Sequence, residues 1–358
     1  MRTLLVTATC ASNVIISVVS TLLYYRELYA LKTSPLFATQ LNGAMQAAIC
    51  GILLLTLDGS GVAPRKSQPP VAMRRWLELA FWFALQNTLE IASIDGLGPA
   101  AGSLAAVLQQ AVVPTTLLVS IVLVGRRYSA LHWASALTVV AGVATSFTAG
   151  ASIPKIPWGW AAALVASRLP QAIANVRTEA ALTSAEPAVR QELRSVLRAG
   201  FWTALFGLGF NVLSGLLLTV ARGEPPARML DDYRTGALCL APNGGCDGAL
   251  SAVLAYAVPG VLFVVSEFAV VQQASASAYM LLVALQLPLV AVALSAKPFM
   301  GSQASPFRPA LLIGVPIIVL GLGLWALAER RAARRRSIEL ESALLADGTS
   351  VPTFRIQN

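Results

Sequence analysis

Residues 249–271 read ALSAVLAYAVPGVLFVVSEFAVV, and this stretch decides the class of fold. As a helix rising ~1.5 Å per residue, it is long enough to cross the ~30 Å hydrocarbon core of a bilayer. It nevertheless contains a charged residue, Glu267, and residues 157–177 (PWGWAAALVASRLPQAIANVR) contain Arg168 in the same way. A charge at that depth costs about 2.5–3.5 kcal/mol on insertion scales, so it is usually kept for a partner, a water-filled cavity or a substrate.

Similar apolar windows recur along the whole chain, which has 358 residues, 56% of them hydrophobic and 12% charged. A soluble domain usually carries about 25% charged residues, so the composition predicts an all-α membrane protein with about ten transmembrane helices. We expect these helices at roughly 4–24, 35–57, 76–95, 99–124, 130–149, 157–177, 198–220, 249–271, 275–296 and 309–328. The third window is the least apolar, because it contains Glu78 and Glu90.

The distribution of Lys and Arg predicts the orientation in the membrane. An even number of spans puts both termini on one side, and the connections on that side then hold sixteen Lys and Arg residues against eight on the other. Cytoplasmic connections are enriched in these residues, so both termini are expected in the cytosol and the connection 221–248 on the opposite side. Cys239 and Cys246 lie in that connection, where an oxidising lumen would permit a disulfide.

The chain divides near Lys155 into two sets of five expected spans. We expect a first five-helix repeat over 1–154 and a second over 155–330, followed by a basic and then polar cytosolic tail, 331–358, without fixed structure. Because five is odd, two related halves must sit inverted relative to each other, an arrangement common in transporters.

A weak repeat is visible in the sequence itself. Gln109 precedes Pro114 in the fourth window, Gln286 precedes Pro288 in the ninth, and each of these windows is followed by one that contains glycine, such as Gly142 in the fifth. The pattern favours two related halves with a substrate site between them near the midplane.

The intramembrane charges have two interpretations. Arg168 lies two residues before Pro170, which frees a backbone carbonyl and can break the helix, as happens around transporter sites. One interpretation is that Arg168 faces a cavity and binds an anionic group; the other is a buried ion pair with Glu267 or Glu90. Glu267 and Glu90 are likewise candidate proton-coupling carboxylates, because burial favours the protonated form of a carboxyl group, or partners in the same structural pair.

Amide side chains are spread over the expected spans. Gln109, Gln286, Asn13, Asn175 and Asn42 are the candidates for hydrogen bonds to a polar substrate. The alternative is that such amides join helices to one another inside the membrane. We expect a cavity lined by the first, second, third, fourth, sixth, eighth and ninth spans.

Other classes of function find little support in the sequence. The basic cluster at 330–336 directly follows the last span, as is typical of the cytoplasmic flank of a membrane helix rather than of a nucleic-acid-binding arm. No glycine-rich phosphate loop with a lysine is present, which counts against an ATP-driven pump. The only histidine, His132, begins the fifth window, so neither a metal site nor a nucleophile–base set is expected, and we predict no enzyme activity and no cofactor.

Five short motifs resemble one known family. They are CASN at 10–13, AGSLAAVLQQAVVP at 101–114, PQAIANVRTE at 170–179, CDGA at 246–249 and QLP at 286–288. Together they are similar to the chloroquine-resistance transporter-like family, which includes the chloroplast thiol transporters of plants and algae, in the drug/metabolite transporter superfamily. The resemblance covers the chain up to about residue 330 and implies the ten-helix fold with two inverted repeats.

The resemblance also implies a function. Members of this family are similar to carriers of amino acids, small peptides and glutathione-like thiols in vacuolar or plastid membranes. We expect a secondary carrier that works by alternating access, with proton coupling or exchange. The family commonly has four cysteines in the lumenal loop, so the two present here imply at most one disulfide. A cation of the malarial member is replaced here by Val14, so drug handling does not carry over. The alternatives are a nucleotide-sugar or triose-phosphate-type antiporter, or a structural membrane protein; whether the protein is a monomer or a homodimer stays open.

Overall fold

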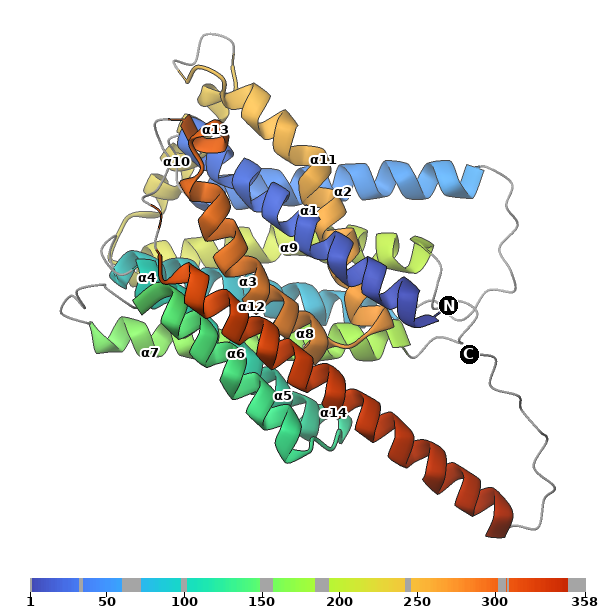
Figure 1. The fold of residues 1–358 in the computed structure, drawn as a ribbon. Helices are drawn as coiled ribbons and strands as arrows, with labels where there is room; N and C mark the ends of the chain where they lie inside the picture. The colour runs from blue at the N-terminus through green and yellow to red at the C-terminus, as the bar shows by residue number, and fades with distance from the viewer. Residues whose placement is uncertain are drawn as a thin grey trace.

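The computed structural model describes residues 2–31, 35–59, 72–97, 102–148, 157–183, 193–241, 246–301, 307 and 309–346. Within these ranges the regular elements are helices, and no strand occurs (Figure 1). The helices are α1 (Arg2–Leu31), α2 (Pro35–Gly59), α3 (Met73–Leu97), α4 (Gly102–Gln109), α5 (Val112–Val124), α6 (Ala130–Thr148), α7 (Trp158–Ala166), α8 (Arg168–Thr183), α9 (Leu193–Ala221), α10 (Pro226–Cys239), α11 (Ala249–Gln273), α12 (Ala276–Ser295), α13 (Lys297–Met300) and α14 (Leu311–Ala346).

Eight segments of the described chain are long and apolar enough to cross a membrane. They match eight of the ten expected windows, and the protein is therefore an all-α, multi-pass membrane protein. The two windows that do not qualify are the third and the sixth. Helix α3 has the length, with 25 residues, but contains several charges, whereas the sixth window is divided between α7, with 9 residues, and α8, with 16.

The interruptions of the helices lie just before prolines. Helices α4 and α5 are separated at Gln110 and Ala111, shortly before Pro114, and α7 and α8 are separated at Ser167, three residues before Pro170. Proline has no backbone N–H and its ring clashes with the preceding turn, which kinks or ends a helix. The break expected near Arg168 is therefore present, and it makes Arg168 the first residue of α8.

Helices from the two ends of the chain pack against one another. Helix α1 packs on α11, α2 on α9, α3 on α8 and α9, α5 on α8, and α6 on α14. In Figure 1 the start of α1 and the far end of α14 lie at the same side of the bundle, while α10 and α13 lie at the other. The segments on either side of residue 155 thus form one bundle, and Lys155 itself lies outside the described residues.

The contact between α6 and α14 depends on glycine. A Cβ atom added to Gly314 would lie 1.8 Å from Ser146 Oγ and 2.5 Å from the carbonyl oxygen of Gly142. One added to Gly321 would lie 2.6 Å from Val139. The backbones of the two helices therefore approach more closely than larger residues allow, which is a common way to join helices inside a membrane.

Two segments expected to be irregular are helical. The long connection 221–248 contains α10, whose first residue is Pro226; proline is well tolerated at that position because its missing N–H has no partner there in any case. A disulfide joins Cys239, the last residue of α10, to Cys246. The tail expected to lack structure from residue 331 instead continues α14 as far as Ala346. Its sequence is rich in Ala, Arg, Glu and Leu, which are strong helix formers.

Candidate functional site

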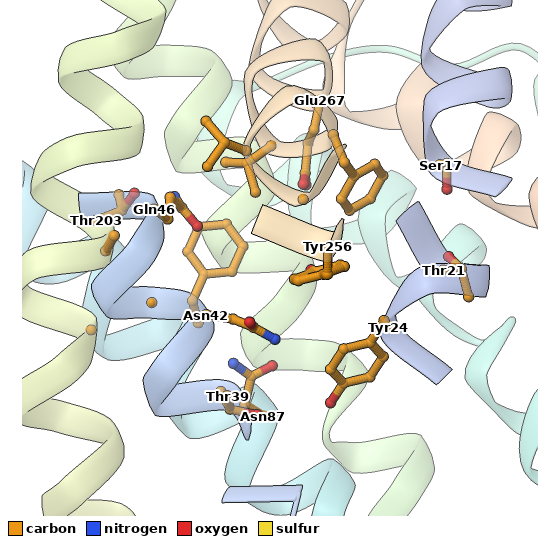
Figure 2. Close-up of a pocket in the computed structure, with 18 of the residues that line it drawn as sticks. Ser17, Thr21, Tyr24, Thr39, Asn42, Gln46, Asn87, Thr203, Tyr256 and Glu267 are labelled. Atoms are coloured by element: carbon orange, nitrogen blue, oxygen red, sulfur yellow. The ribbon is translucent and has the colours of Figure 1, made fainter. Parts of the chain in front are cut away.

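A cavity of about 570 Å³ opens among seven helices: α1, α2, α3, α8, α9, α11 and α12. Figure 2 shows Tyr256 in the middle of the view, with Glu267 above it and Asn42, Asn87 and Tyr24 below. The polar residues that line the cavity are Ser17, Thr21, Tyr24, Tyr25, Thr39, Asn42, Gln46, Gln86, Asn87, Gln171, Thr203, Asn211, Tyr256, Glu267, Tyr279 and Gln286. Small-molecule pockets measure about 300–1,000 Å³, so the cavity has the size of a ligand site.

The set of lining helices differs from the expected one at two points. The fourth span, α4 and α5, supplies no residue to the wall, although it was expected to. The seventh span, α9, supplies Thr203, Ala204, Gly207 and Asn211. The reason lies in the packing: α9 packs on α2, α3 and α11, which all line the cavity, whereas α5 packs mainly on α8 and supplies no lining residue.

Glu267 reaches the cavity wall from α11 (Figure 2). The buried Tyr279 of α12 lies within hydrogen-bonding reach of its carboxylate. Among the ion pairs of the described residues none includes Glu267, so the pairing with Arg168 that the sequence left open is not formed. A carboxylate at a polar cavity without a fixed cation is free to bind a proton or a cationic group.

Asn13 and Gln286 form a hydrogen-bonded chain between three helices. Gln286 donates its amide to Asn13 Oδ1 at 2.8 Å, Asn13 donates to Ser266 Oγ at 2.9 Å, and Ser17 donates to Gln286 Oε1 at 2.9 Å. Gln286 and Ser17 border the cavity, whereas Asn13 is fully buried behind them. The chain therefore holds α1, α11 and α12 together and presents Gln286 to the cavity.

Arg168 lies in a buried ionic network beside the cavity rather than on its wall. Its Nη2 atom lies 2.7 Å from Glu90 Oε2, and its Nη1 atom donates to Gln171 Oε1 at 2.9 Å. Gln109 donates its amide to Glu90 Oε1 at 2.7 Å, and Gln86 also donates to Glu90. Of the two interpretations of Arg168, the geometry corresponds to the ion pair with Glu90. Gln86 and Gln171 connect this network to the cavity wall.

The two remaining candidate amides differ in position. Asn42 lines the cavity and donates to Glu27 Oε2 at 3.3 Å. Asn175 is buried away from the cavity wall, and its amide contacts the sulfur of Met280 at 3.6 Å. Of the predicted substrate-binding residues, Gln286 and Asn42 lie on the cavity; Arg168, Gln109, Asn13 and Asn175 do not.

Three features of this region were not found from the sequence. Glu27 was not considered, because it lies beyond residue 24, where the first apolar window was expected to end, whereas α1 continues to Leu31. The signal that would have found it is the run Leu28-Tyr29-Ala30-Leu31, which shows that the apolar helix continues. The cavity tyrosines, Tyr24 and Tyr256, whose ring centroids lie 5.7 Å apart, gave no distinct signal, since tyrosine is also common at membrane interfaces. The wall contributed by α9 also went unrecognised.

The family is settled by comparison with known proteins. A model of the CRT-like family, described as chloroquine-resistance transporter-like, matches residues 4–325. The chain belongs to this family. The resemblance drawn from the sequence motifs is thereby confirmed, over nearly the whole length that it covered.

The curated relatives that match the chain are 24–27% identical to it. Protein CLT2, chloroplastic, of Arabidopsis thaliana is 27% identical over 90% of this chain and 75% of its own length. The chloroquine resistance transporter of Toxoplasma gondii is 26% identical over 83% of this chain, and Crt homolog 2 of Dictyostelium discoideum is 26% identical over 62%. The match covers 51% of the Dictyostelium protein and 35% of the Toxoplasma protein.

A solved crystal structure shares the fold of this member of the family. It superposes with a TM-score of 0.58 at 19% identity, over 90% of this chain and 99% of the other. At that identity the likeness concerns the fold alone.

Proposed function

We propose that the protein is a secondary active transporter of small polar organic solutes that works by alternating access. The observation that carries the proposal is the polar cavity of about 570 Å³ inside the bundle, with the Glu267 carboxylate on its wall. A structural membrane protein has no need of such a cavity, whose polar lining is costly to maintain inside a bilayer. The names of the Toxoplasma and Arabidopsis relatives support transport and a plastid or other organellar membrane.

The proposal includes ten membrane-crossing segments arranged as two inverted halves, over 1–154 and 155–330. The packing supports this arrangement. We number the ten spans along the chain and let each span of the first half correspond to the span five places later. The pairing of α1 with α11, the first and eighth spans, then corresponds to that of α8 with α3, the sixth and third spans. The pairing of α5 with α8 corresponds in turn to that of α12 with α1, and the pairs α2–α9, α6–α14 and α5–α12 each correspond to themselves. Rocking of two such halves opens the cavity to alternate sides.

The charge of the cavity bears on the substrate. Among the described residues that line it, none is Lys or Arg, and Glu267 is an acidic residue. This lining disfavours the diphosphate of a nucleotide sugar or a triose phosphate, which needs basic groups. It favours solutes with an ammonium group, such as amino acids, small peptides and glutathione-like thiols. Gln286 and Asn42 supply hydrogen bonds to the substrate.

The Glu267 carboxylate provides a basis for coupling substrate transport to proton movement. A carboxylate that accepts either a proton or the ammonium group of a substrate makes the two compete for one site. Proton binding on one side of the membrane and substrate binding on the other then produce exchange. Both termini face the cytosol in this proposal, as the Lys and Arg distribution indicates.

The test is uptake of labelled amino acids, small peptides and glutathione into proteoliposomes. We expect saturable uptake that responds to an imposed pH gradient, together with counterflow when the vesicles are preloaded with unlabelled substrate. Uptake that is linear with concentration and shows no counterflow for any of these solutes would overturn the proposal.

A further inference from the structure

A second carboxylate is buried close to the cavity. Glu27 lies near the end of α1, and its exposed fraction is 0%. It accepts a hydrogen bond from Asn42, whose Nδ2 atom lies 3.3 Å from Glu27 Oε2. Its other oxygen, Oε1, is buried without a hydrogen-bond partner, and so is Oδ1 of Asn42. The pair therefore contains two buried acceptor atoms that lack a donor.

The described residues around Glu27 supply no compensating charge. None of the ion pairs of the described residues includes it, and its neighbour Arg26 is exposed. Among the described residues, the titratable groups that face it are the hydroxyls of Tyr24, on the same helix, and Tyr256, on α11. The side chains at the end of α1, around Leu31, pack in an apolar cluster that also includes Tyr233 of α10. An ionised carboxylate with one hydrogen bond is strongly disfavoured in such a place.

Protonation of Glu27 removes its buried negative charge. A protonated Glu27 is neutral, and its Oε1–H becomes a donor in place of a bare acceptor. Asn42 Oδ1, which has no hydrogen-bond donor, can accept this hydrogen bond. A metal ion is a poorer fit, because hard cations such as calcium take about 6–8 oxygen ligands, whereas two bare oxygens are present here among the described residues.

We propose that Glu27 and Asn42 form a proton-binding site, distinct from Glu267, and that Asn42 connects the proton to the cavity. Helices α1 and α11 run antiparallel, since Asn13 bonds to Ser266 at one end and Tyr24 contacts Tyr256 toward the other. This register puts Glu27 near the level of Val253, about 20 Å along α11 from Glu267. The two acids thus lie toward opposite ends of the bundle. A role of Glu27 in coupling rests on the proposed transport function; the proton site itself does not.

The test is infrared difference spectroscopy of the purified full-length protein, titrated with acid and base in lipid nanodiscs. We expect a protonated-carboxyl band at neutral pH that is lost in Glu27→Gln and retained in Glu267→Gln. The band should shift in position, without being lost, in Asn42→Ala and Asn42→Leu, because its hydrogen-bond acceptor has been removed. Glu339→Gln, at an exposed position of α14, is the control and should leave the band unchanged.

Glu27→Gln has the shape of the protonated acid, so it should fold, and its thermal unfolding is measured alongside. A spectrum of Glu27→Gln identical to that of the unsubstituted protein would overturn the proposal. A band at constant pH that disappears when choline is replaced by sodium would also overturn it, in favour of a cation site. Failure of transport with the Glu27 band present would instead count against the proposed function alone.

Discussion

At the scale of single residues, the polar side chains inside the membrane fall into two groups. Some lie on the cavity, as Glu267 does, and others lie in networks between helices, as Glu90 and Arg168 do. The groups have different consequences when substituted. Removal of a cavity residue changes transport, whereas removal of half of a buried pair changes the free energy of folding.

Replacing Glu267 by Gln should uncouple transport from the pH gradient. The amide cannot exchange a proton, so the gradient-driven component of uptake should fall by about tenfold or more, on the scale of coupling free energies of about 1–3 kcal/mol. Counterflow of neutral substrates should persist. The measurement is uptake into proteoliposomes with and without the gradient, with Glu339→Gln as the matched control. A gradient response equal to that of the unsubstituted protein would remove Glu267 from the coupling step.

Replacing Glu90 by Gln should destabilise the protein, because Arg168 is left charged and buried without a counter-ion. The loss of one partner of a buried pair costs about 3–5 kcal/mol, which lowers the temperature of thermal unfolding in detergent. The double variant Glu90→Leu with Arg168→Met should recover much of that loss.

Substitution of Arg168 distinguishes a structural role of this residue in the ion pair with Glu90 from direct binding of the substrate. Under the structural role, Arg168→Ala lowers the unfolding temperature and leaves the preference between anionic and cationic substrates unchanged. If the unfolding temperature is unchanged and KM rises for anionic substrates alone, Arg168 binds the substrate, which is the other of the two interpretations that the sequence left open.

At the scale of helices, close packing depends on where glycine lies. Gly314 and Gly323 are both on α14, but a Cβ atom on Gly314 meets Ser146 and the backbone of α6, whereas one on Gly323 meets nothing within 4 Å. The two positions therefore separate the effect of contact from the intrinsic effect of glycine in a helix.

Gly314→Ala should destabilise the protein by about 1–3 kcal/mol through overpacking. Gly323→Ala should be neutral, or stabilise by up to about 1 kcal/mol, because alanine is the better helix former. Thermal unfolding of the two variants in the same detergent makes the comparison. Equal unfolding temperatures would show that α6 and α14 separate readily or are not in close contact in the membrane.

At the scale of the whole molecule, the bundle has two ends, one toward each side of the membrane. The connection between α5 and α6 and the start of α6 lie beside the middle of α14, where Tyr128 contacts Trp325 and His132 lies 3.6 Å from Glu329. Helix α10 lies at the other end, beside the start of α2, through the contact of Phe37 with Tyr233. These contacts show which segments lie at the same end of the bundle, and the Lys and Arg distribution predicts which end is cytosolic.

Single cysteines should report these sides. In a background with Cys10 and Cys50 replaced by Ser, Arg127→Cys and Arg335→Cys should react with a membrane-impermeant maleimide from the cytosolic side. Arg234→Cys should react only after the membrane is opened. All three positions are exposed in the structure. Labelling of Arg335→Cys and Arg234→Cys from the same side would contradict both the arrangement of the bundle and the cytosolic termini.

The limits of the sequence appear most clearly at α3 and at Glu90. The third window was recognisably weak because of its charges, and its helix is present from Met73 to Leu97. The partner of Glu90, in contrast, was left open between interpretations. Inside a membrane both the lipid and the neighbouring helices are apolar, so the pattern of apolar residues along a helix does not reveal which face meets protein.

The sequence by itself determined the membrane class, the positions of eight spans, the family and the break before Pro170, because hydropathy, charge and backbone restriction are local properties of the chain. Only the tertiary structure decided that Gln286 meets Asn13, that Arg168 meets Glu90 and that α9 rather than α5 lines the cavity. These contacts join residues far apart along the chain. Their geometry is set by how whole helices pack, and no local property specifies that packing.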